Sequence, residues 1–220
     1  HYRLLDVESL ENNHLRIQAA IKGKAVNYIL PFTGQHWPMM SLAWLAALDV
    51  LGADIDQAMY DLKTFELLSG RGQVIEMAMH KSKVILIDES YNANPDSVKL
   101  ALERLNAYND PCIRRRIAVL GDMGELGFKE IEAHQEIAEY ITGTNIDLVH
   151  GSGIVIQHLY NALPSQMKGY SCEESQDLAQ FLEHHVQPGD IYMVKGSRGG
   201  GVEPRMKCLV DAIKKAASTA

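Results

Sequence analysis

The sequence reads VILIDESYNANPDS over residues 84–97, and this stretch decides the fold of the second part of the chain. Its first four residues are apolar and favour strands, as in a strand buried on both faces of a parallel sheet. Pro95 cannot continue a strand, and Asp96 or Ser97 can cap a following helix. The polar decapeptide 88–97 therefore lies at the carboxyl end of a strand, where open α/β sheets bind ligands. An ordinary capped connection is the alternative, but it does not require two asparagines around one alanine, so a ligand role is favoured.

Strands and helices alternate strictly from residue 84 onward. The predicted strands are 84–87, 117–120, 147–150, 169–171 and 191–194, and the predicted helices are 96–108, 129–142, 153–162, 175–185 and 203–216. Alternation of this kind predicts a mostly parallel, Rossmann-like α/β sheet with right-handed crossovers and flanking helices. The spacing of Gly121, Gly124 and Gly127 is not the dinucleotide fingerprint, so NAD binding is a remote alternative.

The first 81 residues follow a different pattern. The predicted elements are a hairpin turning at residues 22–24, a helix at 38–51, a second helix starting at Asp54 or Asp56, and a strand at 74–79. A polar turn at residues 81–83 then predicts a domain boundary. We therefore expect residues 1–81 to form an incomplete α/β unit with apolar surface, and residues 82–220 to form a compact domain.

The loop after the last predicted strand carries candidate site residues. Lys195, Ser197 and Arg198 follow that strand, so they share the sheet edge with the decapeptide. The glycines at 196 and 199–201 would let a ligand approach the backbone closely. The loop predicts binding of a carboxylate or a phosphate, and a flexible loop tipped by two solvated cations is the alternative.

A third loop, after the strand at 117–120, carries Asp122 and Glu125. Their carboxylates either contact a substrate or complement the dipole of a helix N-terminus, and the sequence does not favour one of the two. The basic run at 114–116 precedes the same strand. It predicts a solvated strand entry rather than a track for phosphates.

Three segments resemble the Mur ligase family. They are DESYNANPDS at 88–97, VLGDMGELG at 119–127 and VKGSR at 194–198, and they occur in the family's order. LPFTGQH at 30–36, followed by an apolar helix, resembles the family's segment before the last helices of its central ATPase domain. The resemblance covers nearly the whole chain. It implies that residues 1–81 are the tail of the central domain and that residues 82–220 are the C-terminal domain.

By this resemblance, the chain is part of an ATP- and Mg²⁺-dependent amide ligase. The nearest likeness is to the members that join D-Ala-D-Ala to UDP-MurNAc-tripeptide. That cytoplasmic step of peptidoglycan synthesis serves cell wall biogenesis, cell shape and cell division. ATP would convert the tripeptide carboxylate to an acyl phosphate, which the dipeptide amine then attacks. The protein's part would be to position the reactants and to neutralise charge.

The resemblance also implies residues on the nucleotide side of the site. It implies a phosphate or ribose contact for Arg71, and a ribose contact for Glu89, where the family usually has aspartate. It places Asn92, Asn94 and His36 near the nucleotide. His36 is equally well explained as a structural residue at a helix N-terminus.

The loop with Arg198 would form the substrate side. Family members use this loop near the incoming amino acid or dipeptide. Arg198 would clamp the D-Ala-D-Ala carboxylate through two parallel hydrogen bonds. Lys195, Ser197 and Asp122 would be further substrate contacts.

Parts of the family's pattern are absent from these 220 residues. No Gly-Lys is followed by Ser or Thr, so the loop that cradles the β and γ phosphates is missing. The UDP-sugar domain is missing too, and Trp37 and Met40 replace the asparagines that follow His36 in the family. We therefore expect an incomplete ligase that needs the missing N-terminal and ATPase regions as partners and is inactive alone. A non-catalytic nucleotide- or amino-acid-binding α/β module is the alternative.

Composition fits a globular enzyme domain. Hydrophobic residues make up 46% of the chain, and the net charge of -7 with scattered basic residues argues against a nucleic-acid surface. The cysteines, Cys112, Cys172 and Cys208, are far apart and predict free thiols in a reducing compartment. No apolar run reaches the ~18 residues of a membrane span, and the histidines lack metal-binding spacing. A soluble, cytoplasmic chain without a metal site is therefore expected.

Overall fold

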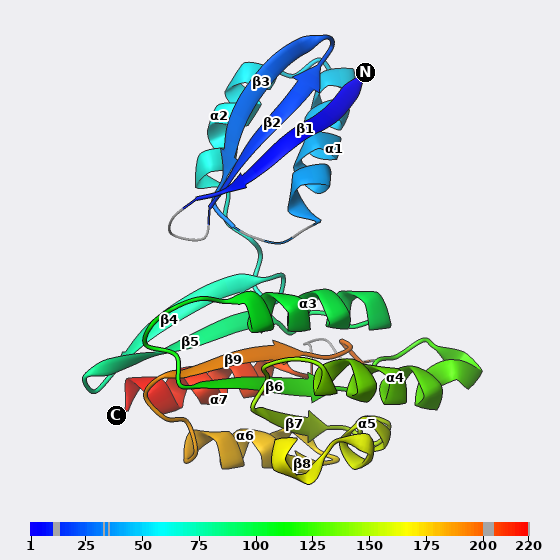
Figure 1. Cartoon of the computed structure of the whole chain (residues 1–220), viewed down its shortest axis with the longest axis vertical. Coiled ribbons are helices and arrows are strands. Elements are labelled where there is room, and N and C mark those ends of the chain that lie inside the picture. The colour runs from blue at the N-terminus through cyan, green and yellow to red at the C-terminus, as the bar shows by residue number, and fades with distance from the viewer. Residues whose placement is uncertain (11–13, 33, 35, 200–204, 220) are drawn as a thin grey trace. The chain divides into compact units, whose positions relative to one another are not determined.

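The computed structural model describes residues 1–10, 14–32, 34, 36–199 and 205–219. The chain forms two compact units, His1–Glu66 and Leu67–Ala220, and each has its own sheet (Figure 1). Residues 200–204 include two glycines of the candidate loop and the start of the last predicted helix. They lie outside the described residues.

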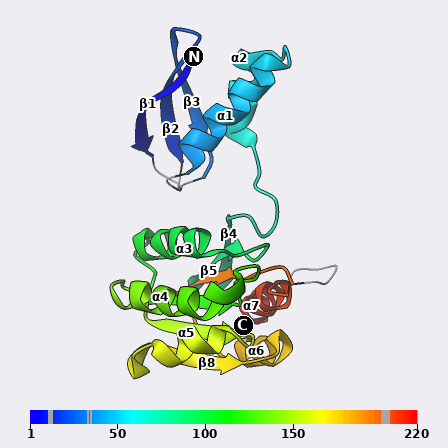
Figure 2. The same cartoon turned by 90° about the vertical axis from the view of Figure 1, so that its right-hand side faces the viewer.

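The first unit is a three-stranded antiparallel sheet with helices on one face (Figure 2). Its elements are β1 (Tyr2–Ser9), β2 (Leu15–Ile21), β3 (Lys24–Leu30), α1 (Trp37–Val50), α2 (Ile55–Asp61) and the 3₁₀ turn η2 (Leu62–Thr64). In β2, Leu15, Ile17 and Ala19 are buried in alternation with polar residues, as a sheet with one covered face requires. Lys22 and Gly23 both have positive φ and form the hairpin turn, so the predicted hairpin is confirmed.

Helix α1 exposes large apolar side chains at its end. Val50 is 84% exposed and Leu51, which follows it, is 81% exposed, while Met39 and Met40 are exposed near the start of the helix. The expected apolar surface on this unit is therefore present.

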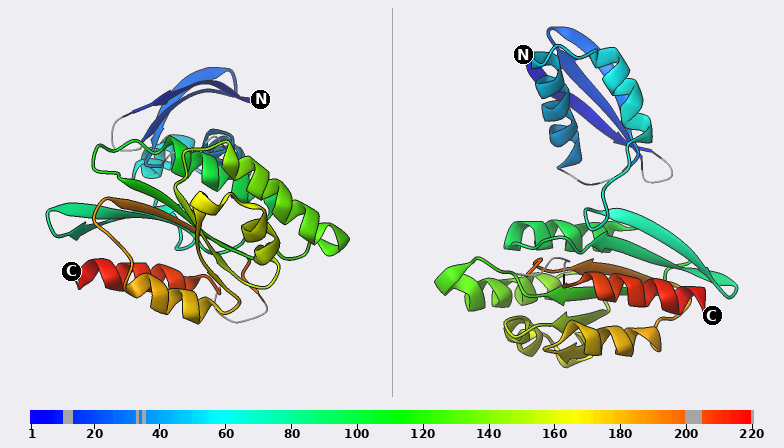
Figure 3. Two further views of the ribbon diagram at one scale, coloured as in Figure 1. Left: turned by 60° about the horizontal axis from the view of Figure 1, so that its bottom comes forward. Right: turned by 180° about the vertical axis from the view of Figure 1, so that it is seen from behind.

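The second unit is a six-stranded sheet in the order β4-β5-β9-β6-β7-β8, with helices on both faces (Figure 3). Its strands are β4 (Gln73–Met79), β5 (Ser82–Glu89), β6 (Arg115–Gly121), β7 (Leu148–Ser152), β8 (Lys168–Cys172) and β9 (Asp190–Lys195). Its helices are α3 (Pro95–Ala107), α4 (Glu130–Thr142), α5 (Ile156–Ala162), α6 (Ser175–Glu183) and α7 (Lys207–Ser218), with short 3₁₀ turns η3 (Gly127–Lys129) and η4 (Ser165–Met167). All neighbouring pairs except β4 with β5 are parallel.

Strand β5 is buried on both faces, as its apolar run predicted. Ile85 and Ile87 pack in the core beneath α3, α4 and α5, whereas Val84 and Leu86 pack in the core beneath α6 and α7. The predicted mostly parallel Rossmann-like sheet is confirmed.

The division between the units lies between Glu66 and Leu67, not at residues 81 and 82 as the polar turn suggested. Strand β4 pairs with β5 along its whole length and is the antiparallel edge of the second sheet. Its side chains explain this placement, because Val74 packs on one core of the second unit and Met77 on the other.

The basic run at 114–116 is not simply a solvated entry to β6. Arg115 donates two hydrogen bonds of 2.7 Å to the carboxylate of buried Asp190 and so links β6 to β9. Arg116 donates to the carbonyl of Tyr108 at 3.0 Å. Two of the three arginines therefore make structural contacts at the start of β6.

His150 on β7 makes the stability of the second unit depend on pH. Its Nδ1 accepts a hydrogen bond of 2.8 Å from the amide of Tyr170, and burial lowers the pKa of the imidazole to about 4. Arg115 and His185 lower this pKa further, and Asp190 opposes them. The unfolded chain therefore binds a proton that the folded chain does not bind between about pH 6.5 and pH 4.

We expect the free energy of unfolding to fall by about 3 kcal/mol from this one group between pH 7 and pH 4. In His150→Gln the fall should be smaller by about that amount, measured by urea denaturation across the pH range. His158→Gln, at an exposed histidine, is the matched control. Parallel pH profiles for wild type and His150→Gln would contradict the assignment.

Candidate functional site

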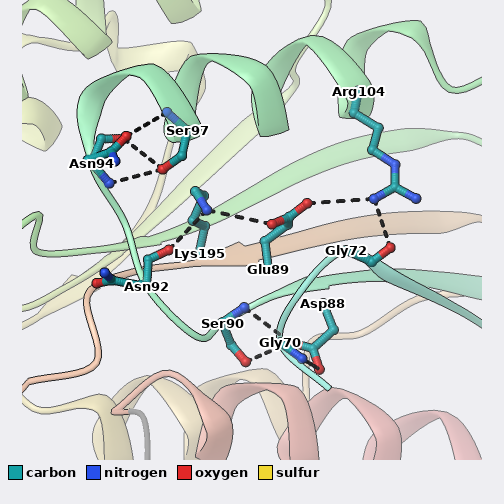
Figure 4. Close-up of polar contacts among 10 residues, drawn as sticks. All are labelled: Gly70, Gly72, Asp88, Glu89, Ser90, Asn92, Asn94, Ser97, Arg104 and Lys195. Atoms are coloured by element: carbon teal, nitrogen blue, oxygen red, sulfur yellow. Dashed lines mark hydrogen bonds and ion pairs between the residues drawn. The ribbon is translucent and has the colours of Figure 1, made fainter. Parts of the chain in front are cut away.

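The carboxyl ends of β5, β6 and β9 lie side by side, because these strands are parallel neighbours in the order β5-β9-β6. The loops that follow them carry the decapeptide, Asp122, and the segment 195–198. The sheet thus brings together three segments that are far apart in the sequence. Figure 4 shows the decapeptide beside Lys195.

Asp88 anchors a turn against the end of β5. Its carboxylate, which is 0% exposed, accepts hydrogen bonds from the Ser69 hydroxyl, the Gly70 amide, and both the amide and the hydroxyl of Ser90. The backbone adds two bonds, from the Gly72 amide to the Asp88 carbonyl and from the Tyr91 amide to the Gly70 carbonyl. The turn that carries Arg71 is therefore fixed beside the decapeptide.

The two glycines of this turn are required by space and by backbone conformation. Gly70 and Gly72 have φ values of +79° and +93°. A Cβ on Gly70 would lie 2.9 Å from the amide nitrogen of Tyr91, and one on Gly72 would lie 2.8 Å from Nη1 of Arg104. At Gly70 the obstacle is backbone, whereas at Gly72 it is the end of the Arg104 side chain, so the positive φ is the stronger requirement for glycine at Gly72.

Glu89 lies between two buried cations (Figure 4). Its Oε2 is 3.6 Å from Nζ of Lys195, the residue that pairs with it on β9, and its Oε1 is 3.6 Å from Nη1 of Arg104 on α3. Burial lowers the pKa of Lys195, which the charge of Glu89 opposes. Lys195 also donates a hydrogen bond of 3.0 Å to the backbone carbonyl of Asn92.

Two arginines from different loops flank one aromatic ring. The guanidinium carbon of Arg71 is 3.9 Å from the centroid of the Tyr91 ring, and that of Arg198 is 5.7 Å from it. Both arginines are exposed. The edge of the site therefore presents two guanidinium groups to solvent around Tyr91.

The two asparagines of the decapeptide have different surroundings. Asn94 caps α3, since its Oδ1 accepts from the Ser97 amide at 2.8 Å while its amide donates to the Ser97 hydroxyl. Asn92 is exposed, and its backbone carbonyl rather than its side chain holds Lys195. Asn92 is thus the asparagine with its side chain open to a ligand.

Ser197 links the three loops. Its hydroxyl accepts from the Gly124 amide at 2.7 Å and donates to the Ala93 carbonyl at 3.2 Å, and its amide donates to the Asp122 carbonyl at 2.8 Å. The hydroxyl of Ser197 is therefore engaged in holding the loops together.

The carboxylate of Asp122 reaches the start of α5, the helix after β7. It accepts hydrogen bonds from the amides of Ile154 and Ile156, at 3.2 and 2.7 Å. A Cβ on Gly153 would collide with it. Of the two roles considered for Asp122, the structure shows that of a partner for a helix N-terminus. The helix is α5, not α4, which follows the loop of Asp122 in the sequence.

His36 belongs to the first unit, whereas the other candidate residues belong to the second. It is exposed at the N-terminus of α1, where its side chain makes no capping hydrogen bond, and its ring lies 4.6 Å from that of Trp37. Trp37 packs edge-on against Phe32 at 4.7 Å. Met40 is exposed on the same helix.

Three residues that fix the loops at the carboxyl ends of the strands were not predicted from the sequence. In the sequence Asp88 is one member of a polar run, although an acidic residue at the end of a fully apolar strand is a signal for a buried acceptor. Arg104 sits in the middle of a helix, with no local sign that it reaches back to Glu89. His134, fully buried on α4, accepts from the Met123 amide through Nε2 and contacts the Glu130 carbonyl through Nδ1, which fixes the loop after β6.

Within the described residues, no three His, Cys, Asp or Glu side chains are grouped closely enough to hold a metal ion. The three cysteines are free. Over the same part of the chain, the helices are all too short or too polar to cross a membrane.

Replacing Asp88 by Asn should destabilise the second unit by about 2–4 kcal/mol, because an amide nitrogen would then face two donors in a buried place. Urea denaturation of the purified chain measures this loss. Asp96→Asn, an exposed change in the first turn of α3, removes only a charge that favours the helix N-terminus and should cost less than about 1 kcal/mol. A loss for Asp88→Asn no larger than that for Asp96→Asn would show that Asp88 does not anchor the turn.

The chain is similar to known proteins. Residues 70–198 match the family model described as "Mur ligase, glutamate ligase domain". A UDP-N-acetylmuramoyl-tripeptide–D-alanyl-D-alanine ligase of Bacillus subtilis is 30% identical over 220 residues, covering 96% of this chain and 45% of that protein. The ligase of the same name from Rickettsia prowazekii is 28% identical over 185 residues, covering 84% of this chain and 40% of that protein.

Solved structures share the fold. A MurF structure from Acinetobacter baumannii superposes with a TM-score of 0.80 at 23% identity, covering 96% of this chain and 45% of that one. A MurF ligase from Thermotoga maritima in complex with ADP gives 0.76 at 22% identity, covering 100% and 47%. The chain thus spans less than half the length of these similar proteins.

Proposed function

Because the chain belongs to the Mur ligase family, whose glutamate ligase domain it carries at residues 70–198, we propose that it is part of an ATP-dependent amide ligase. The reaction is the addition of D-Ala-D-Ala to UDP-MurNAc-tripeptide during cytoplasmic peptidoglycan precursor synthesis, in support of cell wall biogenesis, cell shape and cell division. Two relatives of that name, similar over 84% and 96% of this chain, support this choice of substrates. Residues 1–66 are then the end of a central ATPase domain.

The convergence of three loops at one sheet edge is the observation that carries the proposal. The edge combines a carboxylate set between two cations with two exposed guanidinium groups. Such a set suits a ligand with hydroxyls and anionic groups, as ATP has, next to a second, carboxylate-bearing substrate. The ADP bound in the Thermotoga maritima ligase supports a nucleotide in this fold.

In the nucleotide half we assign the ribose to Glu89 and a phosphate or the ribose to Arg71. Both ion pairs of Glu89 are 3.6 Å long, so its oxygens keep room to accept hydrogen bonds from hydroxyl groups. Asn92, with an exposed side chain, is a better candidate for a nucleotide contact than Asn94, whose oxygen caps α3. His36 stays a candidate of the first unit.

Mg²⁺ belongs with the phosphates in the proposed reaction. The described residues hold no cluster of three metal ligands, so we assign the ion to the phosphates and to parts of the ligase beyond this chain's own carboxylates. The residues of this chain would act on nucleotide charge through the cations of Arg71 and Lys195.

In the dipeptide half the contact to the substrate carboxylate is assigned to Arg198. It is exposed and rests near the Tyr91 ring, so its guanidinium is presented with a defined orientation. Ser197, Asp122 and Lys195 support this contact indirectly. The first two hold the loops, and Lys195 supplies a buried positive charge beside Glu89.

The chemistry of amide ligation explains why cations gather at this edge. An amine that attacks an activated carboxylate produces a tetrahedral intermediate with negative charge, while negative phosphate leaves. Fixed guanidinium and ammonium groups reduce the repulsion between these anions, and a guanidinium that binds the carboxylate of the dipeptide orients its amine for attack. The domain therefore contributes position and charge rather than a nucleophile or a base.

In the full-length ligase, Arg198→Ala should weaken the use of D-Ala-D-Ala by about tenfold to a hundredfold and leave the KM for ATP nearly unchanged, since a charge-assisted clamp is lost. Arg198→Lys should restore part of the loss, because a single ammonium replaces a fork. Steady-state kinetics with each substrate varied in turn measures both effects. Equal losses for ATP and for the dipeptide would contradict the assignment of Arg198 to the dipeptide carboxylate.

The 220-residue chain alone should not release phosphate from ATP when it is given UDP-MurNAc-tripeptide and D-Ala-D-Ala. Its sequence has no loop of backbone amides and lysine to cradle the γ-phosphate. A phosphate-release assay, with the Lys195→Ala/Arg198→Ala double variant as control, tests this. Turnover that depends on both substrates and disappears in the control would contradict the expectation.

A further inference from the structure

Arg104 lies on α3 at the margin of the helix face that packs on the sheet. Ala101 and Leu105 beside it are buried in the core, and the Arg104 side chain is only 10% exposed. Its guanidinium lies over the end of β5 instead of in solvent (Figure 4). The side chain thus carries a permanent charge into the rim of the core.

The contacts of Arg104 join two separate parts of the nucleotide half. Nη1 donates a hydrogen bond of 2.8 Å to the carbonyl of Gly72, which closes the turn that carries Arg71. The same nitrogen is 3.6 Å from Oε1 of Glu89. One nitrogen therefore connects the turn before β4 to the end of β5.

Packing alone does not explain an arginine at this position. Nε of Arg104 is buried without a hydrogen-bond partner in the described structure, and burial lowers the pKa of the guanidinium against the pull of Glu89. An unbranched apolar side chain would cover the same place without burying a charge. The two polar contacts are what an apolar residue could not supply.

We propose that Arg104 is a positioning residue for nucleotide binding, which holds the Glu89 carboxylate and the Arg71 turn in one fixed arrangement. This inference rests on the proposed nucleotide half of the site. Glu89 faces Lys195 on its other side, so the two cations fix both carboxylate oxygens. Arg104 touches neither reactant and acts through Glu89 and Gly72.

Amide hydrogen exchange of the 220-residue chain tests the arrangement directly. In Arg104→Met, the Gly72 amide, which donates to the Asp88 carbonyl, should exchange about tenfold faster, whereas the Val119 amide in the central strand β6 should not change. Arg104→Lys, which keeps a donor near the Gly72 carbonyl, should fall between. Lys99→Met on the same helix is the matched control.

Binding of ADP and of 2′,3′-dideoxy-ADP to the same four proteins, measured by NMR titration, tests the function. Arg104→Met should raise the Kd for ADP about tenfold and leave the Kd for the dideoxy compound nearly unchanged, because only ADP offers hydroxyls to Glu89. Arg104→Lys should recover part of the affinity.

The outcomes separate the two hypotheses. A wild-type chain that binds ADP and prefers it to the dideoxy compound, with Arg104→Met unchanged in exchange and affinity, overturns the inference and leaves the proposed function standing. Faster exchange at Gly72 and Val119 alike, with equal losses for both nucleotides, means a purely structural arginine and also overturns it. A wild-type chain that binds ADP and the dideoxy compound equally well overturns the assignment of the ribose to Glu89, and this inference with it.

Discussion

The arrangement of the candidate site depends on the buried carboxylate of Asp88. A carboxylate without water needs donors, and here four hydrogen bonds from Ser69, Gly70 and Ser90 satisfy it. These bonds draw the turn before β4 onto the end of β5, where two glycines permit the close approach. Arg71 and the decapeptide become neighbours for this reason. In the sequence, 16 residues, which include the whole of β4, separate Arg71 from Asp88.

Side chains at this edge divide into those that hold the loops together and those that are exposed beside Tyr91. Asn94 caps α3, and the Ser197 hydroxyl accepts a hydrogen bond from the loop after β6. The carboxylate of Asp122 accepts a hydrogen bond at the start of α5. Arg71 and Arg198 extend from this frame into solvent beside Tyr91. The exposed groups are therefore preorganised, because the loops that carry them are held by hydrogen bonds that need not rearrange when a ligand arrives.

Local patterns in the sequence predicted the parallel sheet, since β5 is a run of apolar residues and each strand is followed by a helical period. They also predicted which loops meet, because parallel strands end at one edge. The domain boundary was misplaced, because whether β4 pairs with β5 depends on long-range contacts of Val74 and Met77 that no local turn signal encodes. The role of Arg104 was invisible for the same reason, since its partners lie 32 and 15 positions away in sequence and meet it only in the fold.

The charge balance around Glu89 links the fold to the chemistry. Removing Lys195 or Arg104 from water is unfavourable, and a carboxylate between them reduces that cost without forming a tight ion pair, since both distances are 3.6 Å. Tighter ion pairs would occupy the oxygens of Glu89. Without the two cations, its negative charge would stand unbalanced next to the phosphates of the proposed nucleotide. The looser geometry orients Glu89 and leaves its oxygens able to accept hydrogen bonds. The ribose contact proposed for Glu89 requires both properties together.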